Sequence, residues 1–191
     1  LFAADVLRYF LLREIPFGQD GSFSFDALVR RYNAELANGY GNLVSRTFSM
    51  IFKYFDGIIP SLRSPESVSE RKPIEPGGNN DWFFYHPKSL AENGGAFLVQ
   101  IQRAFASTDS PVNLNDLHSI PLSTDTVISA AQPWKKDLAN AEERKVVEDV
   151  LYFAAEAIRL YTAAIYPILP YATAKVWAQL GLGDIQLASD N

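Results

Sequence analysis

One row of polar side chains has the residue types and the spacing to bind a planar, hydrogen-bonding ligand. Asn38, Asn42 and Arg46 follow one another at intervals of four residues, so on an α-helix they share one face and can contact one object together. Asparagine offers a hydrogen-bond donor and an acceptor, and arginine offers a planar fork of donors. The row could therefore read the edge of a nucleotide base. A solvated helix face is the alternative interpretation, because short motifs of this kind are weak signals.

Trp134 is a second candidate for ligand binding. It follows Pro133 and precedes Lys135 and Lys136. A tryptophan beside two cations could form a platform on which a base stacks, an interaction worth about 1–3 kcal/mol per base. The alternative is a tryptophan that is half-buried in the core, since tryptophan is largely buried on average.

Residues that carry out catalysis or bind metals show no recognisable arrangement. The two histidines, His86 and His118, are interpreted as loop residues, and neither has a metal-ligand spacing such as HExxH. The chain contains no Gly-x-Ser-x-Gly elbow and no glycine-rich phosphate loop. The absence of cysteine excludes disulfides and thiolate chemistry and fits a reducing compartment. We therefore predict no catalytic residue, no metal site and no cofactor in this chain.

The polar row belongs to a long helix that we predict from Phe25 to Phe55. Apolar residues recur in it every three or four positions, and Ser24 is the expected N-cap. We place Glu35 on the polar stripe together with the candidate row. Gly39 and Gly41 lie in the middle of this helix, where each costs about 1 kcal/mol relative to alanine. Their presence suggests that a ligand or another segment approaches the backbone there.

The same periodicity predicts four further helices around the long one. They are expected at Ala3–Glu14, Asp125–Ala131, Ala141–Tyr166 with Asn140 as its N-cap, and Ala172–Leu180. Helices joined in this way predict an all-α fold, an up-and-down helical bundle.

A long irregular segment, residues 57–126, interrupts the helical pattern with most of the prolines of the chain. Such a length without regular structure is unusual in a compact domain, so we interpret it as an insertion or an altered region. Two short helices, at 87–93 and 95–105, are predicted within it. We divide the chain into a connecting helix and turn over residues 1–23 and a helical bundle over residues 24–191.

Composition narrows the possible functions further. Of the 191 residues 48% are hydrophobic, which is typical of a folded globular chain. The net charge of −5 disfavours a protein that tracks nucleic-acid phosphates, because neutralising phosphates drives that kind of affinity. A nucleic acid would have to be recognised through a local patch that reads bases. No apolar run approaches the roughly 18 residues needed to span a membrane, so we predict a cytoplasmic protein without a membrane segment.

Several segments resemble bacterial methionyl-tRNA synthetases, which belong to the class I aminoacyl-tRNA synthetases. Asp5–Glu14 and Pro16–Gly21 are similar to the segment that follows the catalytic domain of that family. Segments elsewhere resemble the anticodon-binding domain: its first long helix (Arg31–Asn38 and Gly41–Thr47), its Pro-Trp motif (Gln132–Lys135) and its closing helices (Tyr166–Pro170, Ala174–Trp177 and Leu180–Gly181). The resemblance implies that the helical bundle is an anticodon-binding domain.

The resemblance also implies roles for individual residues. In that family, the residues matching Asn42 and Arg46 hydrogen-bond the first anticodon base, a cytosine, and the residue matching Trp134 stacks on it. Asn38 and Pro133 would support them. Stacking combined with hydrogen bonds to a base edge is the usual way to recognise unpaired bases in RNA loops. The implied partner is tRNA(Met) with a CAU anticodon.

The chain departs from the family pattern in two ways. It lacks the catalytic domain with its His-Ile-Gly-His and Lys-Met-Ser-Lys-Ser signatures, so we expect a C-terminal fragment that does not attach methionine to tRNA alone. The missing catalytic domain would be its partner and would use ATP with magnesium. The family also has an amphipathic helix before the Pro-Trp motif, whereas we expect Thr108–Thr126 to be irregular, which would alter the packing beside Trp134.

Two other functions are compatible with the residues. The chain could be a helical protein-interaction module, or a non-catalytic synthetase remnant, that binds a protein through the aromatic run Trp82–Tyr85. An independent enzyme would need a site within the irregular segment.

Overall fold

The described part of the structure contains helices joined by turns and loops and no strand, which confirms the predicted all-α fold. The computed structural model describes residues 2–15, 18–60 and 114–190. Its elements in chain order are α1 (Phe2–Glu14), α2 (Phe25–Arg31), a π-helix (Tyr32–Gly41), α3 (Asn42–Phe55), α5 (Leu114–Ala131), a 3-10 turn (Pro133–Lys135), α6 (Ala141–Ile165), α7 (Pro170–Gln179) and a second 3-10 turn (Ile185–Asp190). His86, the aromatic run Trp82–Tyr85 and the helices predicted at 87–93 and 95–105 lie outside the described residues.

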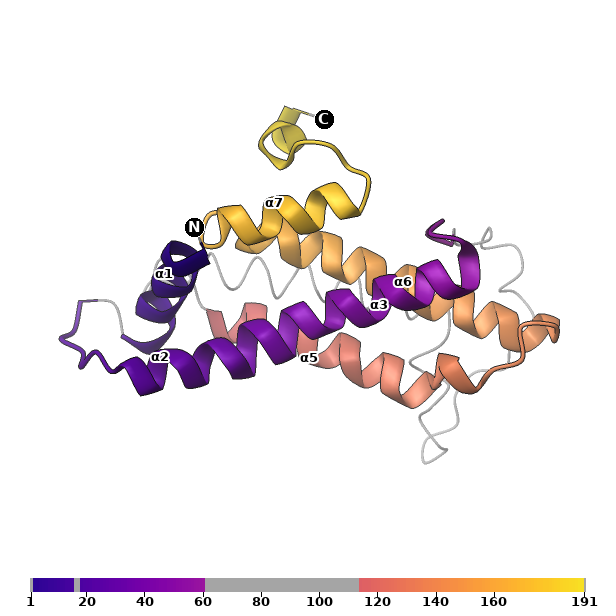
Figure 1. Ribbon diagram of the computed structural model, residues 1–191, viewed down its shortest axis with the longest axis horizontal. Coiled ribbons are helices and arrows are strands. Elements are labelled where there is room, and N and C mark those ends of the chain that lie inside the picture. The colour runs from indigo at the N-terminus through magenta and orange to yellow at the C-terminus, as the bar shows by residue number, and fades with distance from the viewer. Residues whose placement is uncertain (1, 16–17, 61–113, 191) are drawn as a thin grey trace, which may run out of the picture.

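The helices form an elongated bundle in which α2, the π-helix and α3 run along its length (Figure 1). α5, α6 and α7 alternate in direction, and α6 contacts α3, α5 and α7. Fully buried side chains of α5 and α6, such as Leu117, Ile128 and Ile158, form the centre of the core. In the described ranges, no helix has the length and apolarity needed to cross a membrane.

The long helix has the predicted extent, but its middle is not α-helical. Between α2 and α3 the backbone adopts a π-helix over Tyr32–Gly41. Ser24 caps the beginning as predicted, because its hydroxyl accepts a hydrogen bond from the amide of Ala27 at 3.4 Å. At the other end, Asp56 adopts a left-handed conformation with φ of 51° and terminates α3.

The π-helix changes which residues of the long helix face the core. Glu35, which we expected on the polar stripe, is 6% exposed, whereas Phe25 and Val29 of the apolar stripe are 76% and 50% exposed. The cause is the hydrogen bonding of a π-helix, which spans five residues instead of four and makes each turn wider. Within α3 the predicted apolar residues Leu43, Val44 and Ile51 are buried, whereas Phe52 of the same stripe is 69% exposed.

The expectation of an irregular chain up to Thr126 is wrong for residues 114–126. α5 begins at Leu114 and continues through Pro121 to Ala131, so it is longer than the predicted Asp125–Ala131 helix. Leu117, Ile120 and Thr124 are fully buried at helical spacing. Tertiary packing on α6 thus outweighs the local preference of Pro and Ser for loops. An amphipathic helix does lead into Pro133 and Trp134.

The two ends of the described chain are joined through α1 and α7. The buried carboxylate of Asp5 accepts hydrogen bonds from the amides of Tyr171 and Ala172, at 3.1 and 3.0 Å, in the first turn of α7. Arg8 donates to the carbonyl oxygen of Ile168 at 3.0 Å. α7 has no side-chain cap of its own at Leu169, so a residue from α1 satisfies its free amides.

Candidate functional site

Arg46 lies between two side chains that come from the region after residue 113. Its guanidinium carbon is 5.5 Å from the centroid of the Trp134 ring, which is the distance of a cation–π contact. The same guanidinium forms an ion pair with the carboxylate of Asp125 on α5. Two of the residues selected from sequence, Arg46 and Trp134, are therefore brought together, and Asp125 fixes the cation beside the ring.

The end of α5 places Trp134 at the surface. Gln132 adopts a left-handed conformation with φ of 48° and ends the helix. Pro133 is buried at the first position of the following 3-10 turn, which anchors that turn to the bundle. The next residue, Trp134, remains 45% exposed. This ring is therefore attached to rigid structure and still accessible to a planar ligand.

Asn42 and Asn38 complete the polar row on the long helix. Asn42 is the first residue of α3, one turn before Arg46, and Asn38 lies in the π-helix. Both residues are exposed, and within the described residues neither side chain takes part in a hydrogen bond. Their amides are therefore available for a ligand that also reaches Arg46 and Trp134.

A buried ionic cluster lies on the long helix immediately before this row. The carboxylate of Glu35 accepts hydrogen bonds from Tyr9 Oη at 2.5 Å, from Arg13 Nε and Nη2 at 3.1 and 3.2 Å, and from Arg31 Nη1 at 2.7 Å. Arg31 also pairs with Glu14 of α1. We call these five residues the Glu35 cluster. It ties α1 to the end of α2 and to the π-helix.

The pKa values of Glu35, which lies in the π-helix, and of His118, which packs against it, are both lowered. Burial alone would raise the pKa of Glu35, but the hydrogen bonds from Tyr9, Arg31 and Arg13 outweigh burial and lower it. Burial lowers the pKa of His118, and the nearby Glu35 carboxylate only partly opposes this shift. His118 lies within α5, so its interpretation as a loop residue is wrong. Within the described residues, its Nδ1 atom has no hydrogen-bond partner.

The two glycines in the π-helix have different surroundings. A Cβ atom on Gly39 would lie 3.5 Å from Cε1 of His118, an ordinary contact distance, so the imidazole packs against this part of the backbone. A Cβ atom on Gly41 would lie 3.0 Å from the carbonyl oxygen of Leu36. The segment that approaches the backbone at Gly39 is thus α5.

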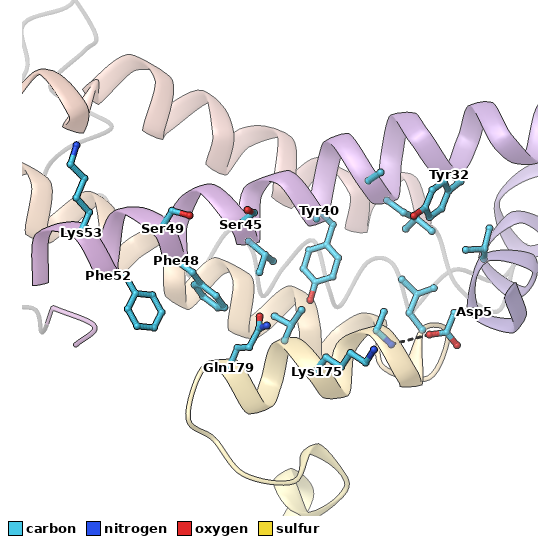
Figure 2. Close-up of a pocket in the computed structure, with 18 residues that line it drawn as sticks. Asp5, Tyr32, Tyr40, Ser45, Phe48, Ser49, Phe52, Lys53, Lys175 and Gln179 are labelled. Atoms are coloured by element: carbon cyan, nitrogen blue, oxygen red, sulfur yellow. Dashed lines mark hydrogen bonds between the residues drawn. The ribbon is translucent and has the colours of Figure 1, made fainter. Parts of the chain in front are cut away.

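A separate groove of about 1180 Å³ lies between the long helix and α7 (Figure 2). Tyr40, Phe48 and Phe52 project toward it from one side, and Lys175 and Gln179 line the α7 side. Asn42, Arg46 and Trp134 are not among its lining residues. The groove and the polar row are therefore different surfaces of the same helix.

Two charged residues of this region, Asp125 and Glu35, were not identified as site residues from sequence. No neighbouring residue in the sequence indicates a role for Asp125, because its partner Arg46 is 79 residues away. For Glu35 the sequence offers one indication, an arginine four residues earlier: Arg31 and Glu35 form an ion pair. Across the described ranges, no group of three or more His, Cys, Asp or Glu side chains could hold a metal ion.

Comparisons with known proteins point to one family. The family model described as tRNA synthetases class I (M) matches residues 1–48. The methionine–tRNA ligase of Halalkalibacterium halodurans is 35% identical over 182 residues, which cover 95% of this chain and 25% of that protein. The Bacillus subtilis methionine–tRNA ligase is also 35% identical, over 97% of this chain and 25% of its own length. This chain therefore spans about a quarter of the length of these curated relatives.

A solved structure has the same arrangement of helices. The crystal structure of Mycobacterium tuberculosis methionyl-tRNA synthetase bound by methionyl-adenylate matches 90% of this chain with a TM-score of 0.70 and 29% sequence identity. The match covers 31% of that protein's chain. Both sequence and fold are thus similar to one part of a larger synthetase.

Proposed function

Because this chain is related along nearly its whole length to one part of the methionine–tRNA ligases, we propose that it recognises the anticodon loop of tRNA(Met). The observation that carries the proposal is the pair of Arg46 and Trp134. A half-exposed indole ring and a fixed guanidinium lie within 5.5 Å of each other, and Asn42, one helical turn before Arg46, is exposed. A single unpaired base could stack on the ring while its edge receives hydrogen bonds from the two polar side chains.

Cytosine fits these donors better than the other pyrimidine. Its O2 and N3 atoms are both acceptors, whereas N3 of uracil carries a proton. Arg46 supplies only donors and Asn42 supplies an NH₂ group. A uracil at the same place would direct its N3 proton at one of these donors, and the lost hydrogen bond costs free energy. A CAU anticodon, whose first base is cytosine, is therefore the proposed target.

The net charge of −5 supports base reading over binding to the phosphate backbone. A protein that binds mainly through phosphates loses affinity steeply as salt rises. The affinity of binding that depends on stacking and on base-edge hydrogen bonds should vary less with salt concentration. We propose that the longer protein selects its tRNA through this bundle and attaches methionine in a catalytic domain that uses ATP, and that the bundle alone only binds.

The test measures binding of the chain to RNA stem-loops by fluorescence anisotropy at low and moderate salt. One stem-loop carries CAU and the other carries UAU. We expect tighter binding to CAU, and Trp134→Ala should weaken it by about 1–3 kcal/mol, the value of one stacked base. Trp134→Phe should retain part of the affinity because it keeps an aromatic face.

The matched control is Phe52→Ala, which removes an aromatic side chain that is 69% exposed on the same helix but lines the groove on its other side. This variant should bind as the wild type does. Equal affinities of the wild-type chain for CAU and UAU would refute the proposal. If Phe52→Ala and Trp134→Ala lose equal affinity for the CAU stem-loop, the assignment of the site to Trp134 is refuted.

A further inference from the structure

The ion pair of Arg46 and Asp125 leaves hydrogen-bonding groups of both side chains unused. Within the described part of the chain, Arg46 donates to Oδ1 of Asp125 through Nη1 alone. Its Nε and Nη2 atoms, and Oδ2 of the carboxylate, take part in no other hydrogen bond there. The two side chains are 31% and 41% exposed. The pair therefore presents free donors and a free acceptor next to each other on an accessible surface.

The ring of Trp134 lies beside this pair. The guanidinium carbon of Arg46 is 5.5 Å from the ring centroid, and the ring is 45% exposed. A base that stacks on an aromatic side chain keeps its Watson–Crick edge open to the groups around the stack. Arg46 contacts the ring and Asp125 contacts Arg46, so both side chains are candidates to meet the edge of a base on Trp134.

The free groups of the pair are complementary to three atoms of cytosine. Cytosine carries acceptors at O2 and N3 and a donor in its 4-amino group. Arg46 can donate to the acceptors, and a carboxylate is a recognised partner of the 4-amino group of cytosine. Uracil carries a proton on N3 and an acceptor at O4 in place of the amino group. It would direct that oxygen at the carboxylate of Asp125, so the contact would be repulsive.

An acidic side chain needs a reason to lie on a surface that binds RNA. Carboxylates repel the phosphates that surround every base, and affinity for nucleic acids comes largely from basic groups. Arg46 neutralises Asp125 in the free chain. In the complex, a base that offers an amino group gives the carboxylate a second partner, whereas a base that offers a carbonyl oxygen does not. The acidic residue thus suits a site that selects among bases.

We propose that Asp125 is a specificity-determining residue whose carboxylate accepts a hydrogen bond from the 4-amino group of the first anticodon base and so distinguishes cytosine from uracil. This inference rests on the proposed function of the polar row. It assigns to Asp125 a direct contact with the RNA in addition to its contact with Arg46.

The test uses a stem-loop in which pyrimidin-2-one replaces the first anticodon cytosine. This base keeps the O2 and N3 acceptors and lacks the 4-amino group. In anisotropy titrations, the wild-type chain should bind it about 5- to 20-fold more weakly than CAU, in the lower part of the range for contacts that discriminate between bases. Asp125→Ala should bind the two RNAs equally. Comparing the two RNAs within each protein cancels any effect of the substitution on Arg46.

Asp125→Asn is a second variant, which keeps the size of the side chain if Asp125→Ala does not fold. Its amide can turn either its oxygen or its NH₂ group toward the base, so its preference for CAU over UAU should fall by about 5- to 20-fold. Glu148→Ala is the control, because it removes one negative charge from a comparable ion pair with Arg144 on α6. It should keep the wild-type preference for CAU over both other RNAs.

The inference is overturned if the wild type binds the CAU and pyrimidin-2-one stem-loops equally. It is also overturned if Asp125→Ala loses as much affinity between these two RNAs as the wild type does, or if Glu148→Ala loses the preference as well. A wild-type chain that does not prefer CAU to UAU would instead refute the proposed function. A preference for CAU that does not depend on the 4-amino group would refute only the role of Asp125.

Discussion

Arg46 on α3 and Asp125 on α5 form an ion pair that joins two helices at the edge of the candidate RNA-binding surface. The guanidinium is thereby held beside the ring of Trp134. An arginine that is already ordered loses less side-chain entropy when a ligand binds, and that entropy costs about 0.5–1.5 kcal/mol for a long side chain. We therefore expect Asp125 to contribute to RNA binding through Arg46.

Replacing Asp125 by Asn should weaken binding to the CAU stem-loop by about two- to tenfold, because Arg46 would have to be ordered on binding. The free energy of unfolding should change by less than about 1 kcal/mol, since both side chains are partly exposed and such pairs stabilise proteins little. Anisotropy titrations and urea denaturation measure the two quantities. Arg144 and Glu148 form a comparable pair on α6, and Glu148→Gln should leave RNA affinity unchanged. Unchanged affinity of Asp125→Asn would contradict the prediction.

Removing the carboxylate of Asp5 should destabilise the bundle. In Asp5→Ala the amides of Tyr171 and Ala172 lose their acceptor, and hydrogen bonds to a charged group are worth about 1.5–3 kcal/mol. We expect the free energy of unfolding to fall by about that amount in urea titrations. Asp26→Ala removes an exposed aspartate from the first turn of α2 and should have a much smaller effect. Equal effects of the two substitutions would show that Asp5 does not cap α7.

Acidification below pH 4.5 should destabilise the chain through Glu35. Its pKa in the folded state lies below the usual value of 4.5, so above that value the unfolded and folded states are both ionised and the stabilisation is complete. As the pH falls through the lowered pKa, the carboxylate takes up a proton and the stabilisation is lost. Chemical denaturation at a series of pH values should therefore give a shallower acid dependence for Glu35→Gln than for the wild type. If the free energy of unfolding depends on pH equally in the variant and the wild type, Glu35 is not the source of the acid destabilisation.

His118 should make the free energy of unfolding depend on pH in a range closer to neutrality than Glu35 does. Burial lowers its pKa below the usual 6.5, so between the folded and unfolded values the unfolded state binds more protons, and stability falls as the pH drops below about 6.5. His118→Gln should remove this slope in thermal denaturation curves recorded between pH 7.5 and pH 5. Titration of the His118 ring by NMR in the wild type supplies the direct check, and a pKa at or above 6.5 would contradict the prediction.

The sequence by itself determined the features that depend on local pattern. The extent of the long helix, the caps at Ser24 and Asn140, and helix α6 follow from apolar spacing and from side chains that satisfy nearby amides. The choice of Arg46 and Trp134 as partners came from their chemistry and from the resemblance to methionyl-tRNA synthetases. The structure brings the two side chains into contact.

Only the tertiary structure decided the features that depend on partners far away in the chain. The continuation of α5 through Pro121 reflects burial against α6, which outweighs the local cost of a proline within a helix. Within the π-helix, Glu35 pairs with Arg13 of α1, 22 residues away, and Arg46 of α3 pairs with Asp125, 79 residues away. A helical periodicity assumes that every turn has the same width, so it cannot show where a π-helix changes the face that a residue presents. It also cannot show which residue from a distant part of the chain a side chain will contact.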